Sequence, residues 1–146
     1  MSNKTLPKWI LIAFVLISFV GFLDASYLTA NHYGQVELSC SITSGCEAVT
    51  TSEYSKIFGV PVALGGILYY LSILLLSLLY LDHKTKFFKK LVPPLTVVGF
   101  LFSAYFVYLQ LFVIGAICQY CVLSAINATL LLALSGFVKC KPRHRN

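Results

Sequence analysis

Four long apolar runs divide the chain, and short polar stretches separate them. The runs cover residues 9–30, 60–81, 91–116 and 118–138. Each reaches the ~20 residues that a helix needs to cross a bilayer, and none alternates as a strand does. Because backbone amides in lipid must pair within their own segment, we predict an all-α integral membrane protein, a four-helix bundle. Pro93 and Pro94 are expected in the first turn of the third helix, where they cost little.

The composition agrees with this interpretation. Apolar residues make up 58% of the chain and charged residues only 11%, which leaves too few polar side chains to cover a soluble domain of 146 residues. Four helices and their connections use this length, so we expect a single membrane domain over residues 1–146. We expect the first run to stay as an anchored helix, because no small-x-small cleavage site follows it.

Basic residues gather on one side of the predicted membrane. Ten of the eleven stand before the first helix, between the second and third, or after the fourth, and Lys56 is the exception in the loop 32–59. The positive-inside rule then makes both termini and the tail 139–146 cytoplasmic and the loop extracytoplasmic. We therefore expect a multi-pass protein of the inner (plasma) membrane. The net charge of +6 reflects this topology and requires no nucleic-acid partner.

Two cysteines, Cys118 and Cys121, begin the fourth predicted helix. Helical spacing places their thiols on nearly the same face, where they can close a small disulfide ring. The N-terminus of this helix points outward, and its dipole favours a thiolate. The alternative is a pair of buried cysteines that pack as small apolar groups.

A second pair, Cys40 and Cys46, lies in the extracytoplasmic loop. Ser44 and Glu47 form an S-x-x-E capping box, which predicts a short helix from Ser44 with Cys46 in its first turn. Two dithiols on the oxidising side of a membrane can relay electrons by thiol–disulfide exchange. The alternatives are a static disulfide or a four-thiolate metal site. We expect no metal, because His32 is the only histidine nearby.

A Cys-x5-Cys loop, a serine a few residues on, the segment Phe58-Gly59-Val60-Pro61 and a CxYC at the head of the last helix together resemble the vitamin K epoxide reductase family. The resemblance is to the bacterial and archaeal form of the family and covers about residues 10–138. The segment 21–29 is also similar to the end of the family's first helix. It implies a bundle that encloses a quinone, capped by the loop and its short helix. It also implies a thiol:quinone oxidoreductase that reoxidises a thioredoxin-like or DsbA-like protein in support of disulfide formation. Menaquinone or ubiquinone would accept the electrons.

The resemblance assigns roles to residues by their positions in the motifs. Cys121 would face the quinone and reduce it, and Cys118 would exchange with Cys46. Cys40 would form the mixed disulfide with the protein partner. Ser52, six residues after Cys46, would hydrogen-bond a quinone oxygen from a place about two turns into the loop helix.

Other polar residues are further candidates. Asn127 either positions the quinone ring or hydrogen-bonds between helices. A carboxylate is costly inside a membrane helix, so Asp24 is either functional or an interfacial cap paired with Ser26, Tyr27 or a neighbouring helix. Cys140 is expected to be a reduced spare thiol on the cytoplasmic side.

Two features set the chain apart from relatives of the family it resembles. Many bacterial relatives carry a fused thioredoxin-like domain, whereas this sequence ends at Asn146, so we expect a separate partner protein. Ala125 stands near where the vertebrate enzymes keep a tyrosine, which argues against epoxide chemistry. The alternatives are a DsbB-type quinone reductase by convergence, whose CxxC lies in the first external loop, and a non-enzymatic membrane metal-binding or assembly protein.

Overall fold

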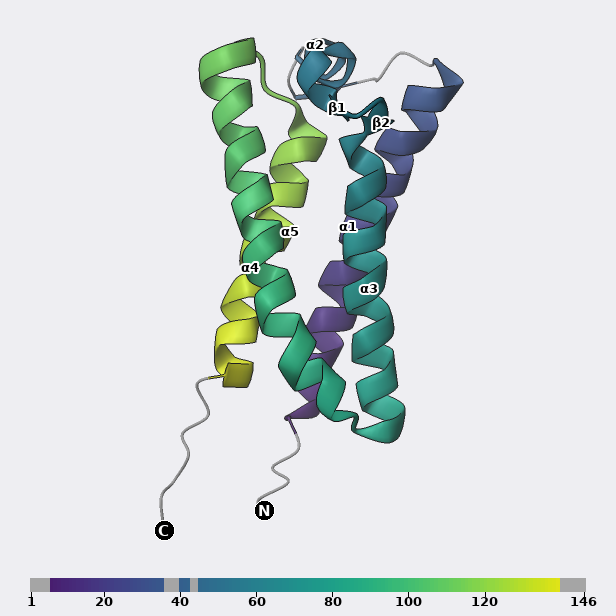
Figure 1. Ribbon diagram of the computed structural model, residues 1–146, viewed down its shortest axis with the longest axis vertical. Helices are drawn as coiled ribbons and strands as arrows, with labels where there is room; N and C mark the ends of the chain where they lie inside the picture. Colours follow the sequence, from purple (N-terminus) through teal and green to yellow (C-terminus); the bar gives the residue numbers. More distant parts are fainter. Residues whose placement is uncertain (1–5, 36–39, 43–44, 140–146) are drawn as a thin grey trace.

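The computed structural model describes residues 6–35, 40–42 and 45–139, shown in Figure 1. Its elements are, in chain order, α1 (Lys8–Gly34), α2 (Cys46–Thr51), the 3-10 turn η1 (Glu53–Ser55), β1 (Lys56–Ile57), β2 (Val60–Pro61), α3 (Val62–His83), α4 (Lys86–Tyr108), the π-helical turn η2 (Leu109–Ile114) and α5 (Gln119–Lys139). In this part of the chain, α1, α3, α4 continued by η2, and α5 are long and apolar enough to span a membrane. The four-helix fold class is confirmed.

The third membrane helix begins five residues earlier than predicted. The basic turn from Lys86 is already helical, and its Phe88 is fully buried against the bundle. Pro93 and Pro94 therefore lie about two turns inside α4, which corrects their expected first-turn position. The hydroxyl of Thr96, one turn further on, donates to the Pro93 carbonyl at 2.9 Å.

A short hairpin, which the sequence patterns did not predict, leads from the loop into α3. β1 and β2 pair antiparallel across a two-residue turn. Phe58 and Gly59 form that turn with φ of 52° and 80°, and positive φ at both central residues is what the tight hairpin turn requires.

The helices pack as two closely associated pairs. α1 packs mainly on α3, α4 packs mainly on α5, and α1 also contacts α5. Figure 1 shows α2 and the hairpin across one end of the bundle, while α1 begins and α5 ends at the opposite end. The two cysteine motifs, separated by some 70 residues of sequence, are thereby brought to the same end.

Aromatic side chains close the end of the bundle where α1 begins. Phe88 lies fully buried between Phe14, at 5.4 Å between ring centroids, and Tyr80, at 5.1 Å. Tyr80 also accepts the N–H of Leu6 at its hydroxyl, 3.3 Å away. The main apolar core therefore occupies this half of the bundle.

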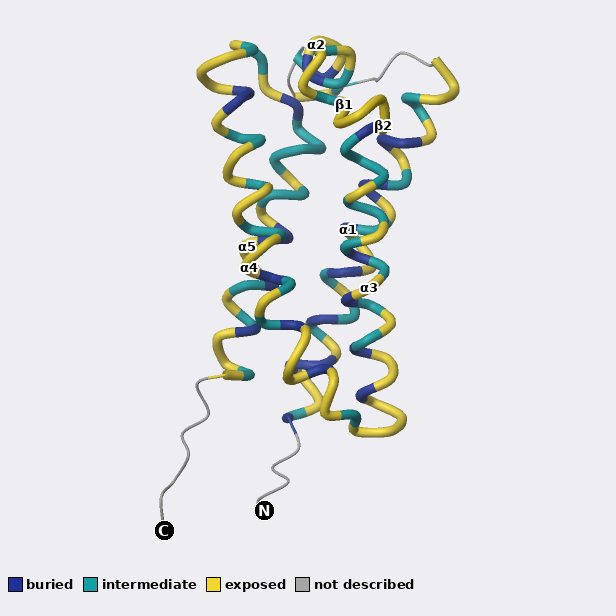
Figure 2. The backbone as a smooth tube through the Cα atoms, in the orientation of Figure 1, coloured by how far each residue is buried: buried dark blue, intermediate teal, exposed yellow. Residues whose placement is uncertain are grey.

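The outer faces of the helices are apolar, and several polar side chains lie inside. Figure 2 shows exposed positions along the outside of every long helix. Large exposed side chains include Leu16, Leu68, Leu101 and Phe137, and fully buried polar ones include Ser18, Ser77 and Thr96. This distribution is the reverse of that in a soluble protein and suits a bundle surrounded by lipid.

Candidate active site

The loop cysteines Cys40 and Cys46 form a disulfide. α2 begins at Cys46, which lies in its first turn as predicted, and Gly45 is the N-cap without a side-chain capping bond. Ser44, the predicted cap, lies outside the described residues. Cys46 is only 1% exposed, whereas Cys40 is partly exposed. Of the two, Cys40 is the more accessible to a molecule outside the membrane.

Cys118 and Cys121 are both reduced, and Cys118 lies immediately before α5. The N–H of Cys118 donates to Oε1 of Gln110 at 2.9 Å, and its carbonyl accepts the N–H of Val122 at 3.1 Å. The Cys121 thiol, together with the N–H groups of Cys121 and Tyr120, hydrogen-bonds the Cys118 sulfur. These bonds lower the pKa of Cys118 to about 7, although burial opposes them. Cys118 is therefore a good leaving group in thiol–disulfide exchange near neutral pH.

The two cysteine pairs meet in one buried cluster. Cys46 and Cys118, the latter completely buried, belong to the same group of packed side chains. Gly45 lies directly against the segment before Cys118, because a Cβ at this glycine would come within 2.7 Å of the Ile117 nitrogen and 2.8 Å of its oxygen. The close approach is possible only for a residue without a side chain.

Gln119 and Tyr120, the two residues between the CxxC cysteines, contact the loop and α1. The Oε1 atom of Gln119 accepts the N–H of Ile42, which lies between the loop cysteines, at 3.1 Å. The ring of Tyr120 packs against that of Tyr27 of α1, with 5.2 Å between centroids. The CxxC motif thus supplies contacts that position the loop as well as two thiols.

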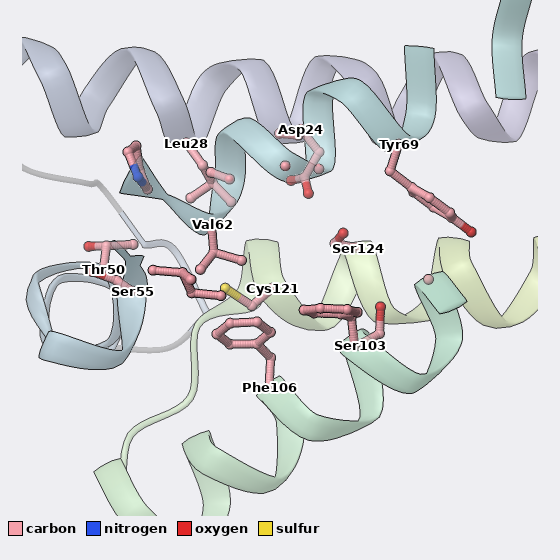
Figure 3. A pocket seen from close by; sticks show the side chains of 18 of the residues that line it. Asp24, Leu28, Thr50, Ser55, Val62, Tyr69, Ser103, Phe106, Cys121 and Ser124 are labelled. Atoms are coloured by element: carbon pink, nitrogen blue, oxygen red, sulfur yellow. The ribbon is translucent and has the colours of Figure 1, made fainter. Parts of the chain in front are cut away.

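A cavity of about 600 Å³ opens between the helices beside Cys121. Its size is typical of small-molecule sites. Cys121 lines it, whereas the buried Cys118 is not among its lining residues. In Figure 3 the Cys121 sulfur points into this space, near Phe106 and Val62. The apolar part of the wall includes Leu28, Val62, Leu95, Val98, Phe102 and Phe106.

Ser52 lines the cavity but does not lie within the loop helix as predicted. α2 ends at Thr51, and Ser52 has an extended backbone because its hydroxyl bonds back to the Val49 carbonyl at 2.7 Å, an arrangement that competes with helix continuation. Ser55 also lines the cavity, and its hydroxyl donates to the Ser52 carbonyl at 2.7 Å. Two hydroxyl groups thus lie at this wall, and each donates its proton to a backbone carbonyl.

Gln110, Tyr70 and Ser124 line the cavity and were not among the predicted site residues. Gln110 lies in the π-helical turn η2, a feature frequent at functional sites, and its Nε2 has no hydrogen-bond partner among the described residues. The Tyr70 hydroxyl contacts both the carbonyl of Ser124, at 2.8 Å, and its hydroxyl, at 2.9 Å. Tyr70 carried a sequence signal as an aromatic residue that could line a quinone site, although packing was the favoured interpretation, and Gln110 carried one as a lone amide in an apolar run.

The remaining candidates fall in different places. Asn127 is buried in α5, but it is not a lining residue of this cavity, and the structure does not bring it together with the other candidates. Asp24 does line the cavity. Cys140 lies outside the described residues. In the part of the chain that is described, no group of three or more His, Cys, Asp or Glu side chains could hold a metal ion.

A buried dithiol beside an apolar cavity, in a bundle of membrane-spanning helices, defines a thiol-dependent redox site for an apolar substrate. The model of the vitamin K epoxide reductase family matches residues 12–136, and the chain belongs to this family. Comparison with individual curated proteins found no significant match. Members of the family are quinone-reducing enzymes, so the chain is a multi-pass membrane thiol/quinone oxidoreductase. The bacterial or archaeal form and the separate partner protein stay predictions.

Proposed function

We propose that the protein oxidises an extracytoplasmic thioredoxin-like protein and passes the electrons to a membrane quinone. The electrons would travel through Cys40 and Cys46, then through Cys118 and Cys121. The observation that carries the proposal is the packing of Cys46 with Cys118, while Cys121 opens onto the cavity. Family membership supports the two ends of this route, thiols and a quinone.

Each transfer in the relay exchanges one disulfide for another. A thiolate of the partner attacks Cys40, which breaks the loop disulfide and releases Cys46 as a thiolate. When the CxxC pair is oxidised, Cys46 attacks Cys118 and releases Cys121. The partner's second thiol then attacks the partner sulfur in the mixed disulfide with Cys40, which oxidises the partner and releases Cys40 as a thiolate. Cys40 attacks Cys46, which re-forms the loop disulfide and releases Cys118 as the leaving group. The net result is an oxidised partner and a reduced CxxC pair.

The arrangement in the structure matches the stage that precedes quinone reduction. The loop pair is oxidised and the CxxC pair is reduced. Two electrons leave the CxxC sulfurs as the bond between Cys118 and Cys121 forms, and the quinone takes them up with two protons to become a quinol. On quinone binding, the Ser52 hydroxyl would turn from the Val49 carbonyl and donate its hydrogen bond to a quinone oxygen, with Ser55 beside it as the alternative donor.

The distribution of lysines supports an extracytoplasmic position for the cysteines. Lys56 lies at the cysteine end of the bundle, and the other six lysines of the described residues lie towards the opposite end. These six are Lys8, Lys84, Lys86, Lys89, Lys90 and Lys139. By the positive-inside rule, that opposite end is cytoplasmic.

Cysteine variants test the division of labour in the relay. Cys40→Ala should stop oxidation of a reduced DsbA-like protein. Decylubiquinone reduction by dithiothreitol should stay largely intact, because this small dithiol can reduce the CxxC pair through Cys121, which lines the cavity. Cys121→Ala should abolish both activities, and Cys140→Ala is the matched control with both intact. Equal loss of both activities in the first two variants would show that the order is wrong. Tightly bound zinc or copper without quinone reduction would favour the metal-binding alternative.

A further inference from the structure

Asp24 is a buried acid in the middle of the membrane-spanning part of α1. It is 7% exposed, and neither carboxyl oxygen has a hydrogen-bond partner among the described residues. The cap expected from the sequence is not formed, since Ser26 bonds to the Phe22 carbonyl at 2.7 Å and the Tyr27 ring packs on Tyr120. No contact among the described residues therefore explains why a carboxyl group stands at this buried position.

The carboxyl group faces the cavity that Cys121 opens onto. Figure 3 shows Asp24 pointing from α1 into this space, across from Cys121 and Ser124. Among the described residues that line the cavity it is the only carboxylic acid, and it lies close enough to Cys118 and Cys121 for their charges to interact. An ionised carboxylate without partners is expensive in apolar surroundings, so the neutral acid, which holds a transferable proton, is the favoured form.

The reduction of a quinone at this site needs a proton that the thiols do not supply. With Cys118 as a thiolate, the CxxC pair holds one proton, on Cys121, whereas the quinol takes up two. A protonated carboxyl group on the wall of a largely apolar cavity can provide the second. Proton donation in the transition state by a positioned acid typically accelerates a reaction by about 10²–10⁴-fold.

We propose that Asp24 is the acid that protonates the quinone as the Cys118–Cys121 disulfide forms. The inference rests on the proposed function. Two electrons pass from the sulfurs to the quinone, one proton comes from the Cys121 thiol and the other from Asp24. The negative charge that began on Cys118 ends on the Asp24 carboxylate. Water that enters the cavity then returns a proton to the Asp24 carboxylate.

Several other titratable groups share this environment, so the pH profile alone does not identify Asp24. Tyr70 of α3, Tyr120 and Cys121 of α5, and Cys118 before α5 interact electrostatically with it. The remaining titratable groups on the cavity wall are Tyr69 of α3, Tyr54 of η1 and His32 of α1. The lining residues of α4 and η2 carry no charge.

The test compares Asp24→Asn, which keeps the size of the side chain, with Asp24→Ser, which leaves space for a small acid. Decylubiquinone reduction by dithiothreitol is measured over a range of pH, with kcat and KM determined separately. We expect kcat to fall about a hundredfold in both variants while KM changes little. Added formate should restore kcat in Asp24→Ser, and more so at low pH, where formic acid is protonated. Asp82→Asn, at an aspartate that is 75% exposed, is the control and should behave as wild type.

The outcomes separate this inference from the proposed function. Wild-type protein that does not reduce decylubiquinone would refute the proposed function itself. If wild type is active, unchanged kcat in Asp24→Asn would overturn the role of Asp24 alone. A rise in KM with kcat unchanged would show that Asp24 binds the quinone and does not protonate it. Should Asp24→Asn fail to fold, formate rescue of Asp24→Ser decides, and a folded but unrescued protein contradicts the proposal.

Discussion

Replacing Gly45 by alanine should separate the two cysteine pairs without altering either one. The new Cβ would lie 2.7 Å from the Ile117 nitrogen, whereas ordinary contacts begin at 3.4 Å, so the backbones must move apart by about 0.7 Å. The backbone of Gly45, with φ of −96°, is accessible to alanine, so the change adds no conformational strain of its own. The displacement therefore acts mainly on the distance between Cys46 and Cys118.

A displacement approaching 1 Å can slow a reaction by about 10²-fold when it misplaces the reacting atoms. We expect Gly45→Ala to slow oxidation of a reduced DsbA-like protein by about 10- to 100-fold, measured by stopped-flow mixing. Decylubiquinone reduction by dithiothreitol bypasses this contact and should stay near the wild-type rate. Gly136→Ala is the matched control, because a Cβ there meets no atom within 4 Å. Wild-type partner oxidation in Gly45→Ala would refute the idea that this contact sets the exchange distance.

Three further predictions follow from the site and the topology. Ser52→Ala should lower the kcat of quinone reduction about tenfold, the scale of one hydrogen bond worth ~1.4 kcal/mol; a loss in Ser55→Ala instead would transfer the role to that serine, and no loss in either would exclude both. The thiolate absorbance of the reduced CxxC pair should rise with pH through a midpoint of about 7, because the hydrogen bonds that lower the pKa of Cys118 favour its charged form below the ordinary thiol range; a midpoint near 9.0 would contradict those bonds. In a background without native cysteines, a thiol reagent should label Gln35→Cys from outside intact cells and Lys86→Cys only after permeabilisation. Labelling of Lys86→Cys from outside would show that the predicted orientation is wrong.

Local sequence motifs were sufficient to predict the cysteine pairs of the site. They did not predict how the two pairs lie relative to each other. Cys118 and Cys121 could be assigned to one helical face from spacing alone. The approach of Gly45 to Ile117 involves backbones more than 70 residues apart, and no local pattern encodes it. Ser52 shows the limit within a single segment, because a hydroxyl bond to Val49 ended the short helix one residue before the predicted donor.

The long helices and the membrane environment were determined by the sequence itself, because lipid admits little except continuous apolar helices and each such run must pair its own amides. The cysteine motifs likewise identified the chemistry, since thiols in two spaced pairs favour disulfide exchange. Only the tertiary structure decided which polar side chains face the cavity. Asp24 and Gln110 turn towards it whereas Asn127 does not, and three isolated polar residues in apolar runs look alike until helix packing orients them. Orientation depends on contacts between helices far apart in sequence, which hydrophobic periodicity specifies poorly when every face of a helix is apolar.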